Sequence, residues 1–272
     1  MTPGTALTEL SASKELLANL TLRDLRGKYK RTALGWGWSL LNPLAMMAMY
    51  SLVFGVLLRI DPPVGADGLR SYPLFLLCGL LPWTFVSNGV TGGMESLLAN
   101  ANLIKKTWFR REVLVVSTVL SFLVSFATEM VVLAVAFLVF GSMVLPWLPA
   151  VVLLMALLTV FVTGLALLLS VVNVYFRDAR YLVGIGLQLW FYATPILYPI
   201  DLVQDSSLPG WALRLYGANP MVGFVESIRD VLYVQQVPPL GTLAYLVVVS
   251  AAVFALGARV FLRLEGRLAE EL

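Results

Sequence analysis

The sequence predicts an all-α integral membrane protein with six transmembrane helices, and three observations carry this prediction. Hydrophobic residues make up 59% of the 272 residues and charged residues only 13%, against about 25% charged in soluble domains. The mean hydropathy of +0.86 agrees with this composition. Several long intervals contain no charged residue, and Lys and Arg concentrate in alternate connecting segments. These features exclude an ordinary soluble fold.

The uncharged intervals place the six spans, since a helix needs about 20 apolar residues to cross a bilayer. The longest interval, 130–176, is interrupted by Gly141 and by Pro146-Trp147-Leu148-Pro149, which predicts a turn there with an interfacial tryptophan. Pro195 and Pro199 predict that the fifth helix breaks before its outer end. The predicted spans are 36–58, 72–93, 113–140, 148–175, 181–199 and 239–262.

The distribution of Lys and Arg predicts the orientation. The N-terminal segment, the loops 95–112 and 177–180 and the C-terminal end from Arg259 onward hold fifteen of the nineteen basic residues. By the positive-inside rule both termini are cytoplasmic. The chain therefore divides into a cytoplasmic N-terminus over 1–35, a transmembrane domain over 36–264 and a cytoplasmic tail over 265–272. The net charge of +3 is read as this topology signal, not as nucleic-acid binding.

Residues 13–34 are too polar to span a membrane but are patterned. Leucines recur at helical spacing between basic residues, which predicts a basic amphipathic helix lying in the membrane interface. Ser13 is its candidate N-cap, with Glu15 in the first turn. A solvated juxtamembrane segment is the alternative.

The residue types and motifs that the sequence lacks exclude several kinds of chemistry. The sequence has no histidine and a single cysteine, Cys78, so His-based catalysis, His-ligated metals and an intrachain disulfide are ruled out. It also lacks the phosphate-binding Gly-x4-Gly-Lys-Ser/Thr loop, so any pump built on this chain takes its energy from another chain.

Glu129 is the one acidic residue deep in a span and should face the protein interior. Its role is either a structural hydrogen bond or a proton or substrate contact. Gly89 and Gly93 are spaced for close helix packing.

Four segments carry more information than apolar runs. They read RDLRGKYK (23–30) leading through LGWGW (34–38) to NP (42–43), NLIKKTWFRRE (102–112), NVYFRD (173–178) followed by TPILYP (194–199), and NP (219–220) with RD (229–230). In this order, from about Leu20 to Leu264, they resemble the ABC type-2 transporter permeases that export lipid-linked polysaccharides such as O-antigen, teichoic acid and galactan. One departure is Arg110, which stands where that family usually has the proline of Phe-Pro-Arg-Glu.

The resemblance implies a partnership and a substrate. It implies a homodimer in the bacterial cytoplasmic membrane, with two copies of a separate cytoplasmic ABC ATPase that carries ATP and Mg, and no cofactor on this chain. The substrate would be a polyprenyl-pyrophosphate-linked glycan passing along the dimer axis. In the resembled family the segment 201–238 dips back into the membrane as short helices, whereas the sequence alone equally allows a helix on the outer surface. Residues 219–235 are predicted to be helical, with Asn219 as the cap and Pro220 first.

Polar and aromatic residues at helical spacing on the first and fifth spans predict the glycan path, because an amide that faced lipid would remain unsatisfied. The alternative is that these residues pack span one against span five. The channel candidates are Ser39, Asn42, Met46, Tyr50, Tyr181, Gln188, Tyr192 and Tyr198.

Two basic regions are candidates for other contacts. The loop 95–112 offers aromatic anchors to an ATPase groove, or its lysines reach lipid headgroups; the turn 177–180 either joins this contact or is a tight charged turn. Coupling candidates are Lys105, Lys106, Trp108, Phe109, Arg110, Arg111, Arg177 and Asp178. Lys28, Lys30 and Arg31 would bind the carrier diphosphate specifically, or anionic lipid generically.

Rival functions remain at this stage. An ABC type-2 exporter of a drug or lipid shares the topology, and a stand-alone secondary carrier or channel belongs to another class. A neighbouring gene for a P-loop ATPase separates these classes.

Overall fold

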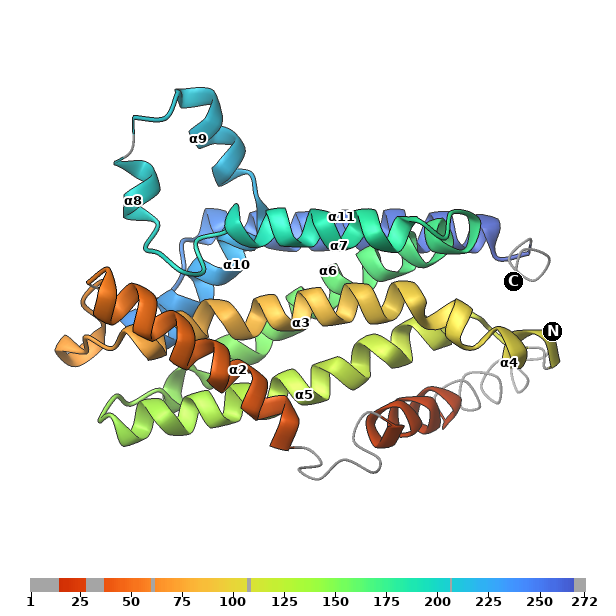
Figure 1. The fold of residues 1–272 in the computed structure, drawn as a ribbon, viewed down its shortest axis with the longest axis horizontal. Coiled ribbons are helices and arrows are strands. Elements are labelled where there is room, and N and C mark those ends of the chain that lie inside the picture. Colours follow the sequence, from red (N-terminus) through yellow and green to blue (C-terminus); the bar gives the residue numbers. More distant parts are fainter. Residues whose placement is uncertain (1–14, 28–36, 60–61, 107–108, 206, 267–272) are drawn as a thin grey trace.

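The computed structural model describes residues 15–27, 37–59, 62–106, 109–205 and 207–266 (Figure 1). Most of the described residues are helical, and no strand occurs among them. Four helices are long and apolar enough to cross a membrane: α3 (Tyr72–Ala99), α5 (Glu112–Val139), α6 (Leu148–Tyr175, preceded by a 3-10 turn, Leu145–Trp147) and α11 (Leu240–Leu264). They coincide with four of the six predicted spans. At 1.5 Å per residue, a helix of 28 residues is about 42 Å long.

The other two predicted spans form shorter helices. The first is α2 (Gly37–Tyr50), which continues as a π-helical segment, Ser51–Leu57. The fifth is α7 (Ala179–Tyr192), which is only 14 residues long. The predicted span 181–199 is therefore too long, because the chain leaves the helix at Ala193, ahead of Pro195. That ring disfavours helical geometry at Thr194.

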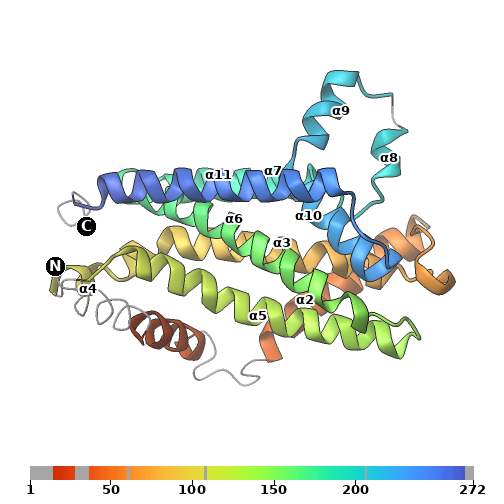
Figure 2. The same cartoon turned by 180° about the vertical axis from the view of Figure 1, so that it is seen from behind.

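The bundle is organised around α3, whose middle is buried by α5, α6 and α10 (Figure 2). Gly89 and Gly93 allow the approach of α6: a Cβ atom on Gly93 would lie 2.6 Å from Cβ of Ala166, and one on Gly89 2.7 Å from Cγ1 of Val162. The predicted packing role of both glycines is confirmed. On its other side α6 meets α11, where a Cβ on Gly257 would lie 2.1 Å from the carbonyl oxygen of Gly164.

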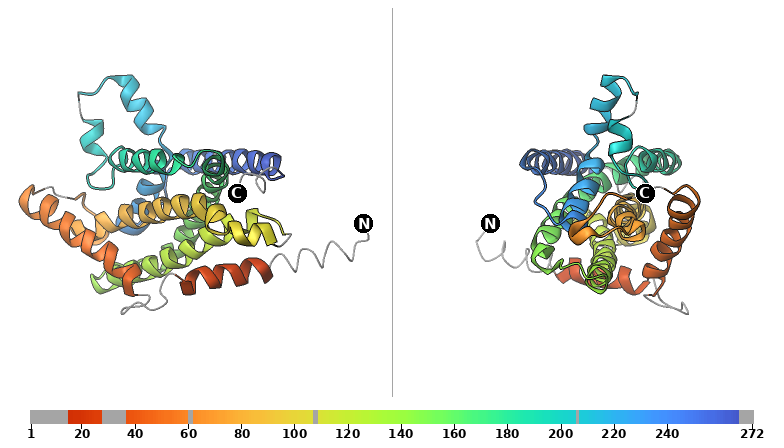
Figure 3. Two further views of the ribbon diagram at one scale, coloured as in Figure 1. Left: turned by 45° about the vertical axis from the view of Figure 1, so that its right-hand side comes forward. Right: turned by 90° about the vertical axis from the view of Figure 1, so that its left-hand side faces the viewer.

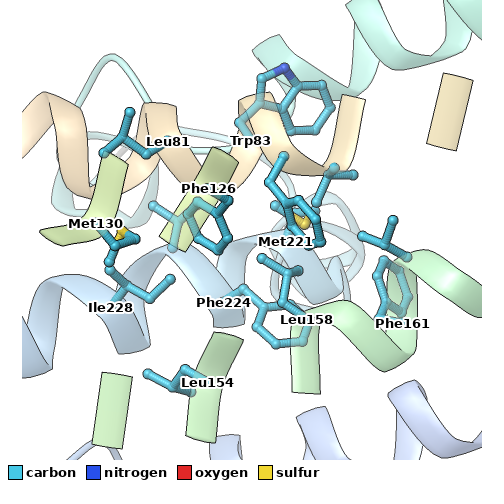
Figure 4. Close-up of a cluster of buried hydrophobic side chains, with 14 of the residues drawn as sticks. Leu81, Trp83, Phe126, Met130, Leu154, Leu158, Phe161, Met221, Phe224 and Ile228 are labelled. Carbon is cyan, nitrogen blue, oxygen red and sulfur yellow. The ribbon is translucent and has the colours of Figure 1, made fainter. Parts of the chain in front are cut away.

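Aromatic and aliphatic side chains fill the space between these helices (Figure 4). Phe85 of α3 stacks on Phe126 of α5 with ring centroids 4.9 Å apart. The cluster drawn in Figure 4 joins residues of α3, α5, α6 and α10. Its labelled members are Leu81, Trp83, Phe126, Met130, Leu154, Leu158, Phe161, Met221, Phe224 and Ile228.

The segment between α7 and α11 contains three helices. The short α8 (Asp201–Gln204) and α9 (Gly210–Gly217) stand away from the bundle (Figures 1 and 3). Helix α10 (Pro220–Arg229) then returns and packs against α3, α6 and α11, and a π-helical turn, Asp230–Val234, follows it. The predicted cap and first residue are confirmed, since the Asn219 side chain accepts a hydrogen bond from the Met221 amide and Pro220 begins the helix.

The connecting segments separate onto two ends of the bundle. One end holds helix 15–27, the short helix α4 (Ala101–Lys106) and the end of α11 (Figure 1). Arg23 donates to the Asn100 side chain over 3.0 Å, and the Arg111 guanidinium donates to the Glu265 carbonyl. At the other end, Tyr233 donates to the Leu69 carbonyl. The segments with the predicted basic excess thus share one end, and the assignment of that end to the cytoplasm remains a prediction.

Residues 15–27 form one helix whose Leu20 and Leu25 are buried, whereas Leu22 is exposed. Asp24 accepts a hydrogen bond from Thr118 of α5 over 3.2 Å. This helix is therefore docked on the bundle by both apolar and polar contacts. Its predicted place in a membrane interface is a separate expectation, and the candidate cap Ser13 lies outside the described residues.

Candidate functional site

A groove of about 430 Å³ lies between α2, α3 and α7. Helix α2 contributes Met46 and Tyr50 to its wall, and α7 contributes Gly184, Leu187, Gln188, Phe191 and Tyr192. The remaining wall belongs to α3. The α3 residues of this wall extend from Leu80 to Thr91, about three helical turns, so the groove runs along the bundle and not across one end of it.

Four predicted channel residues, Met46, Tyr50, Gln188 and Tyr192, meet in this groove. Tyr181 lines a different cleft, at the other end of α7. Tyr198 lies beyond α7, where its hydroxyl donates to the Tyr192 carbonyl over 2.9 Å. Ser39 and Asn42 belong to α2, but their side chains lie outside the described part of the structure.

The groove also contains a polar wall that the sequence analysis missed. Thr84, Ser87, Asn88 and Thr91 lie on one face of α3, at the i, i+3, i+4, i+7 spacing of a helical stripe. The Thr84 hydroxyl donates to the Leu80 carbonyl over 2.9 Å, so its lone pairs stay available as acceptors. The spacing was visible in the sequence, but the prediction took polar stripes only from the first and fifth spans.

Aromatic rings border this polar wall. Phe191 contacts both Tyr50 and Trp83, with ring centroids 6.3 Å and 5.7 Å away. Phe191, which was not predicted, therefore packs α7 against α2, whereas Gln188 is exposed and Tyr192 is 59% exposed. The groove combines hydroxyl and amide groups with apolar ring faces. Binding sites for polar organic ligands have this combination of groups.

A hydrogen-bond network fixes the break after α7. Asn219 accepts from the Trp190 indole N–H over 2.7 Å and donates to the Ala193 carbonyl over 3.0 Å. Its amide also donates to the Thr194 hydroxyl over 3.3 Å. One side chain thus caps α10 and holds the end of α7 next to it. Since Trp190 in turn packs edge-on against Trp83 at 5.8 Å, this network supports the groove wall from behind.

Arg229 holds the same break from the other end of α10. It is 3% exposed and donates to the carbonyls of Pro195 and Ile196. It also pairs with Glu226 at 2.8 Å, and its guanidinium lies 3.7 Å from the centre of the Phe75 ring. Burial raises the pKa of the Glu226 carboxyl, and the Arg229 charge opposes that shift. Arg229 stands in the RD motif at 229–230, for which the sequence predicted no role.

The predicted coupling residues lie at the end of the bundle that holds α4. Lys105 and Lys106 end α4 with exposed side chains, and Phe109 is half-buried. Arg110 pairs with Glu112, and the backbone amide of Arg111 donates to the Glu265 carboxylate over 3.2 Å. Arg177 and Asp178 are exposed in the turn between α6 and α7. The predicted sites at Trp108, Lys28, Lys30 and Arg31 lie outside the described residues.

Glu129 faces the protein interior, as predicted, with 6% of its surface exposed. It lines a cavity of about 330 Å³ between α2, α3 and α5, whose other lining residues are apolar except for Ser71. Within the described residues no cluster of three His, Cys, Asp or Glu side chains could hold a metal ion.

Apolar helices long enough to cross a bilayer, with a polar and aromatic groove along one side, are typical of a membrane transport protein, and sequence comparison gives the family. Residues 15–233 match the ABC-2 type transporter family, and the chain belongs to it. The chain is 33% identical over 256 residues to the O-antigen export system permease protein RfbA of Myxococcus xanthus, covering 93% of this chain and 94% of the relative. It is 33% identical to a Klebsiella pneumoniae protein of the same name, covering 79% of each chain. The polysialic acid transport protein KpsM of Escherichia coli is 23% identical, covering 83% of this chain and 84% of KpsM.

Proposed function

We propose that this chain is the membrane subunit of an ATP-driven exporter that moves a lipid-linked polysaccharide from the cytoplasm to the outer face of a bacterial cytoplasmic membrane. The observation that carries the proposal is the groove between α2, α3 and α7, where amides and hydroxyls lie beside aromatic rings. Sugars suit such a surface, because their hydroxyls pair with the polar groups and their C–H faces pack on the rings. The relatives named for O-antigen export and polysialic acid transport support a glycan.

The polar wall of α3 argues against the rival substrates. A drug or lipid exporter would present mainly apolar surface to its cargo, whereas Thr84, Ser87, Asn88 and Thr91 give this groove a hydroxyl and amide lining. Membership of the ABC-2 family argues against a stand-alone carrier or channel. A glycan of the O-antigen, teichoic acid or galactan type would fit this lining equally, since each offers many hydroxyls.

A homodimer would complete the path. The groove is open along one side of the subunit, and beside it α7 exposes Leu182, Ile185 and Leu189. A second copy facing this side would cover that apolar surface and close two grooves into one channel, consistent with the prevalence of two-fold symmetry among oligomers.

The partner ATPase would bind at the end that holds α4. Lys105 and Lys106 are exposed there, and the adjoining segment is tied to α11 through Arg111 and Glu265. ATP and Mg would reside on the partner, with no cofactor on this chain. The carrier diphosphate would meet Lys28, Lys30 and Arg31, which directly follow the helix over 15–27.

The test measures export per assembled complex in Asn88→Leu and Gln188→Leu. Each variant removes one exposed amide from the groove, and the loss of a hydrogen bond of about 0.5–1.5 kcal/mol corresponds to about a two- to tenfold loss of export. Subunit yield, dimerisation and ATPase binding should stay normal, because neither side chain is buried.

Gln204→Leu on α8 is the matched control, since it makes the same exposed amide apolar at a position outside the groove. It should export normally. If both groove variants match wild type, or if the control loses as much activity as they do, the groove is not the glycan path.

A further inference from the structure

A second hollow, which we call the inner cleft, lies where the groove wall reaches the α4 end of the bundle. It has a volume of about 470 Å³ and lies between the ends of α3, α6 and α7. Its polar lining consists of Glu95, Asn173, Arg177, Asp178, Arg180 and Tyr181. None of these residues was predicted to contact substrate except Tyr181.

The charged side chains of the inner cleft, all of them in the described part of the chain, form no ion pair with one another. Two carboxylates and two guanidinium groups line it, yet no ion pair within 4.0 Å joins any of them in the described part of the chain. Arg180 instead lies 4.7 Å from the centre of the Tyr181 ring and donates to the Tyr181 hydroxyl over 3.0 Å. The cleft therefore keeps acceptors and donors facing open space.

A buried amide adds a further unused acceptor. Asn173 of α6 is fully buried, and its amide nitrogen donates to the Met94 carbonyl over 3.3 Å. Its Oδ1 atom has no hydrogen-bond partner in the described structure. A buried acceptor without a partner is uncommon and indicates a missing donor. At this site the donor would come from the cleft that Asn173 lines.

This mixture of groups selects among ligands. Carboxylates and the Asn173 oxygen only accept hydrogen bonds, and guanidinium groups only donate. A sugar hydroxyl does both, so a run of hydroxyls can satisfy the whole set. A diphosphate has only acceptor oxygens at neutral pH, so it could pair with Arg177 and Arg180 but would leave Glu95, Asp178 and the Asn173 oxygen without donors and would be repelled by both carboxylates.

The inner cleft also continues the groove. On α3, Glu95 follows Thr91 of the groove by four residues, and on α7, Tyr181 precedes Gly184 by three. Both steps keep to the same helix face, and the first advances about 6 Å along the axis. A chain lying in the groove would thus extend into the cleft.

We propose that the inner cleft is a sugar-binding subsite, which takes uncharged sugar units of the glycan through their hydroxyls and excludes the carrier diphosphate. This inference rests on the proposed export function and adds a specific entry site to it. Tyr181 would supply the ring for a sugar face, and Glu95 the acceptor.

The experiment uses the complete complex with its ATPase in lipid nanodiscs. The probe is the free, carrier-less glycan released by mild acid from the host's own surface polysaccharide, with inorganic pyrophosphate as the competitor. Saturation-transfer NMR measures glycan binding. Wild type should bind the glycan, and pyrophosphate should not displace it.

Variants locate the binding. Glu95→Leu should weaken glycan binding about tenfold, as expected for loss of a charged hydrogen bond, and Glu95→Gln should restore part of it because the amide still accepts. Tyr181→Ala should also weaken it. Glu15→Leu, in the helix over 15–27, is the control for loss of an exposed carboxylate at the same end. Arg177 and Asp178 are left unchanged because an ATPase contact is proposed for them.

Two results would overturn the inference: displacement of the glycan by pyrophosphate, or unchanged glycan binding in Glu95→Leu and Tyr181→Ala. If either occurs while Gln188→Leu still reduces export, only the inner cleft is reassigned. If neither groove nor cleft variants affect export, the proposed function fails with it.

Discussion

Arg229→Met should destabilise the subunit strongly, because it removes a buried guanidinium and leaves its partners behind. The carbonyls of Pro195 and Ile196 lose their donors, and Glu226 loses its counter-ion. Methionine fills a similar volume and can still contact the Phe75 ring, so the expected loss is polar and not a cavity effect. Breaking a buried pair on one side costs about 3–5 kcal/mol.

This loss can be expressed as a melting temperature. A change of 1 kcal/mol shifts the unfolding temperature of a chain of this size by about 2–4 °C, so the variant should melt about 6–20 °C below wild type. Thermal unfolding of the detergent-solubilised subunit, followed by tryptophan fluorescence, measures it. The melting temperature of Arg229→Lys should lie between those of wild type and Arg229→Met, because an ammonium group lacks the planar fork that reaches two carbonyls at once.

The double variant Glu226→Gln/Arg229→Met tests the ion-pair contribution. If the unpaired carboxylate carries part of the cost, the double variant should be more stable than Arg229→Met alone, with a coupling of about 0.5–3 kcal/mol. The predicted role of Arg229 would be refuted if Arg229→Met melted within 2 °C of wild type. It would also be refuted if the stability losses of Glu226→Gln and Arg229→Met simply added in the double variant.

Three further predictions concern packing, coupling and topology. Gly257→Ala should lower stability, because its Cβ would lie 2.1 Å from the Gly164 carbonyl oxygen. Gly241→Ala on the same helix meets open space and should be neutral or slightly stabilising. Thermal unfolding compares the two variants, and equal effects would contradict the close approach of α6 and α11. Replacing Trp108 and Phe109 together by alanine should weaken ATPase binding or uncouple hydrolysis from export, measured by co-purification and ATPase assays; normal export would remove this segment as the coupling element. Cysteines placed at Ser13 and Ala269 should resist a membrane-impermeant label from outside while one at Ala66 reacts; the opposite pattern would invert the topology.

The long apolar helices could be predicted from the sequence because their signal is one-dimensional. Uncharged runs of sufficient length mark α3, α5, α6 and α11 whatever they pack against. The cap at Asn219 and the break before Pro195 were equally local, since each depends on the backbone geometry of neighbouring residues. The inward orientation of Glu129 followed from the cost of exposing a carboxylate to lipid.

The composition of the groove depended on the tertiary structure. The sequence indicated polar faces on the first and fifth spans, but it did not show that the stripe from Thr84 to Thr91 on α3 lies between them. A polar stripe indicates which face of a helix avoids lipid. It does not indicate which other helix that face contacts. Which stripes share one groove is decided by helix packing, here by contacts such as Phe191 on Tyr50 and Trp83.

The role of Arg229 shows the same division. Arg229 stands in the RD motif at 229–230 without a role predicted from the sequence, and its partners are backbone carbonyls thirty-three and thirty-four residues away in sequence. Carbonyl groups are common to every residue and leave no mark in the sequence. Only the return of α10 into the bundle brings Arg229 to the two carbonyls that the break after α7 leaves without helical partners. For this reason the sequence determined the long helices, whereas the tertiary structure decided which residues form the site.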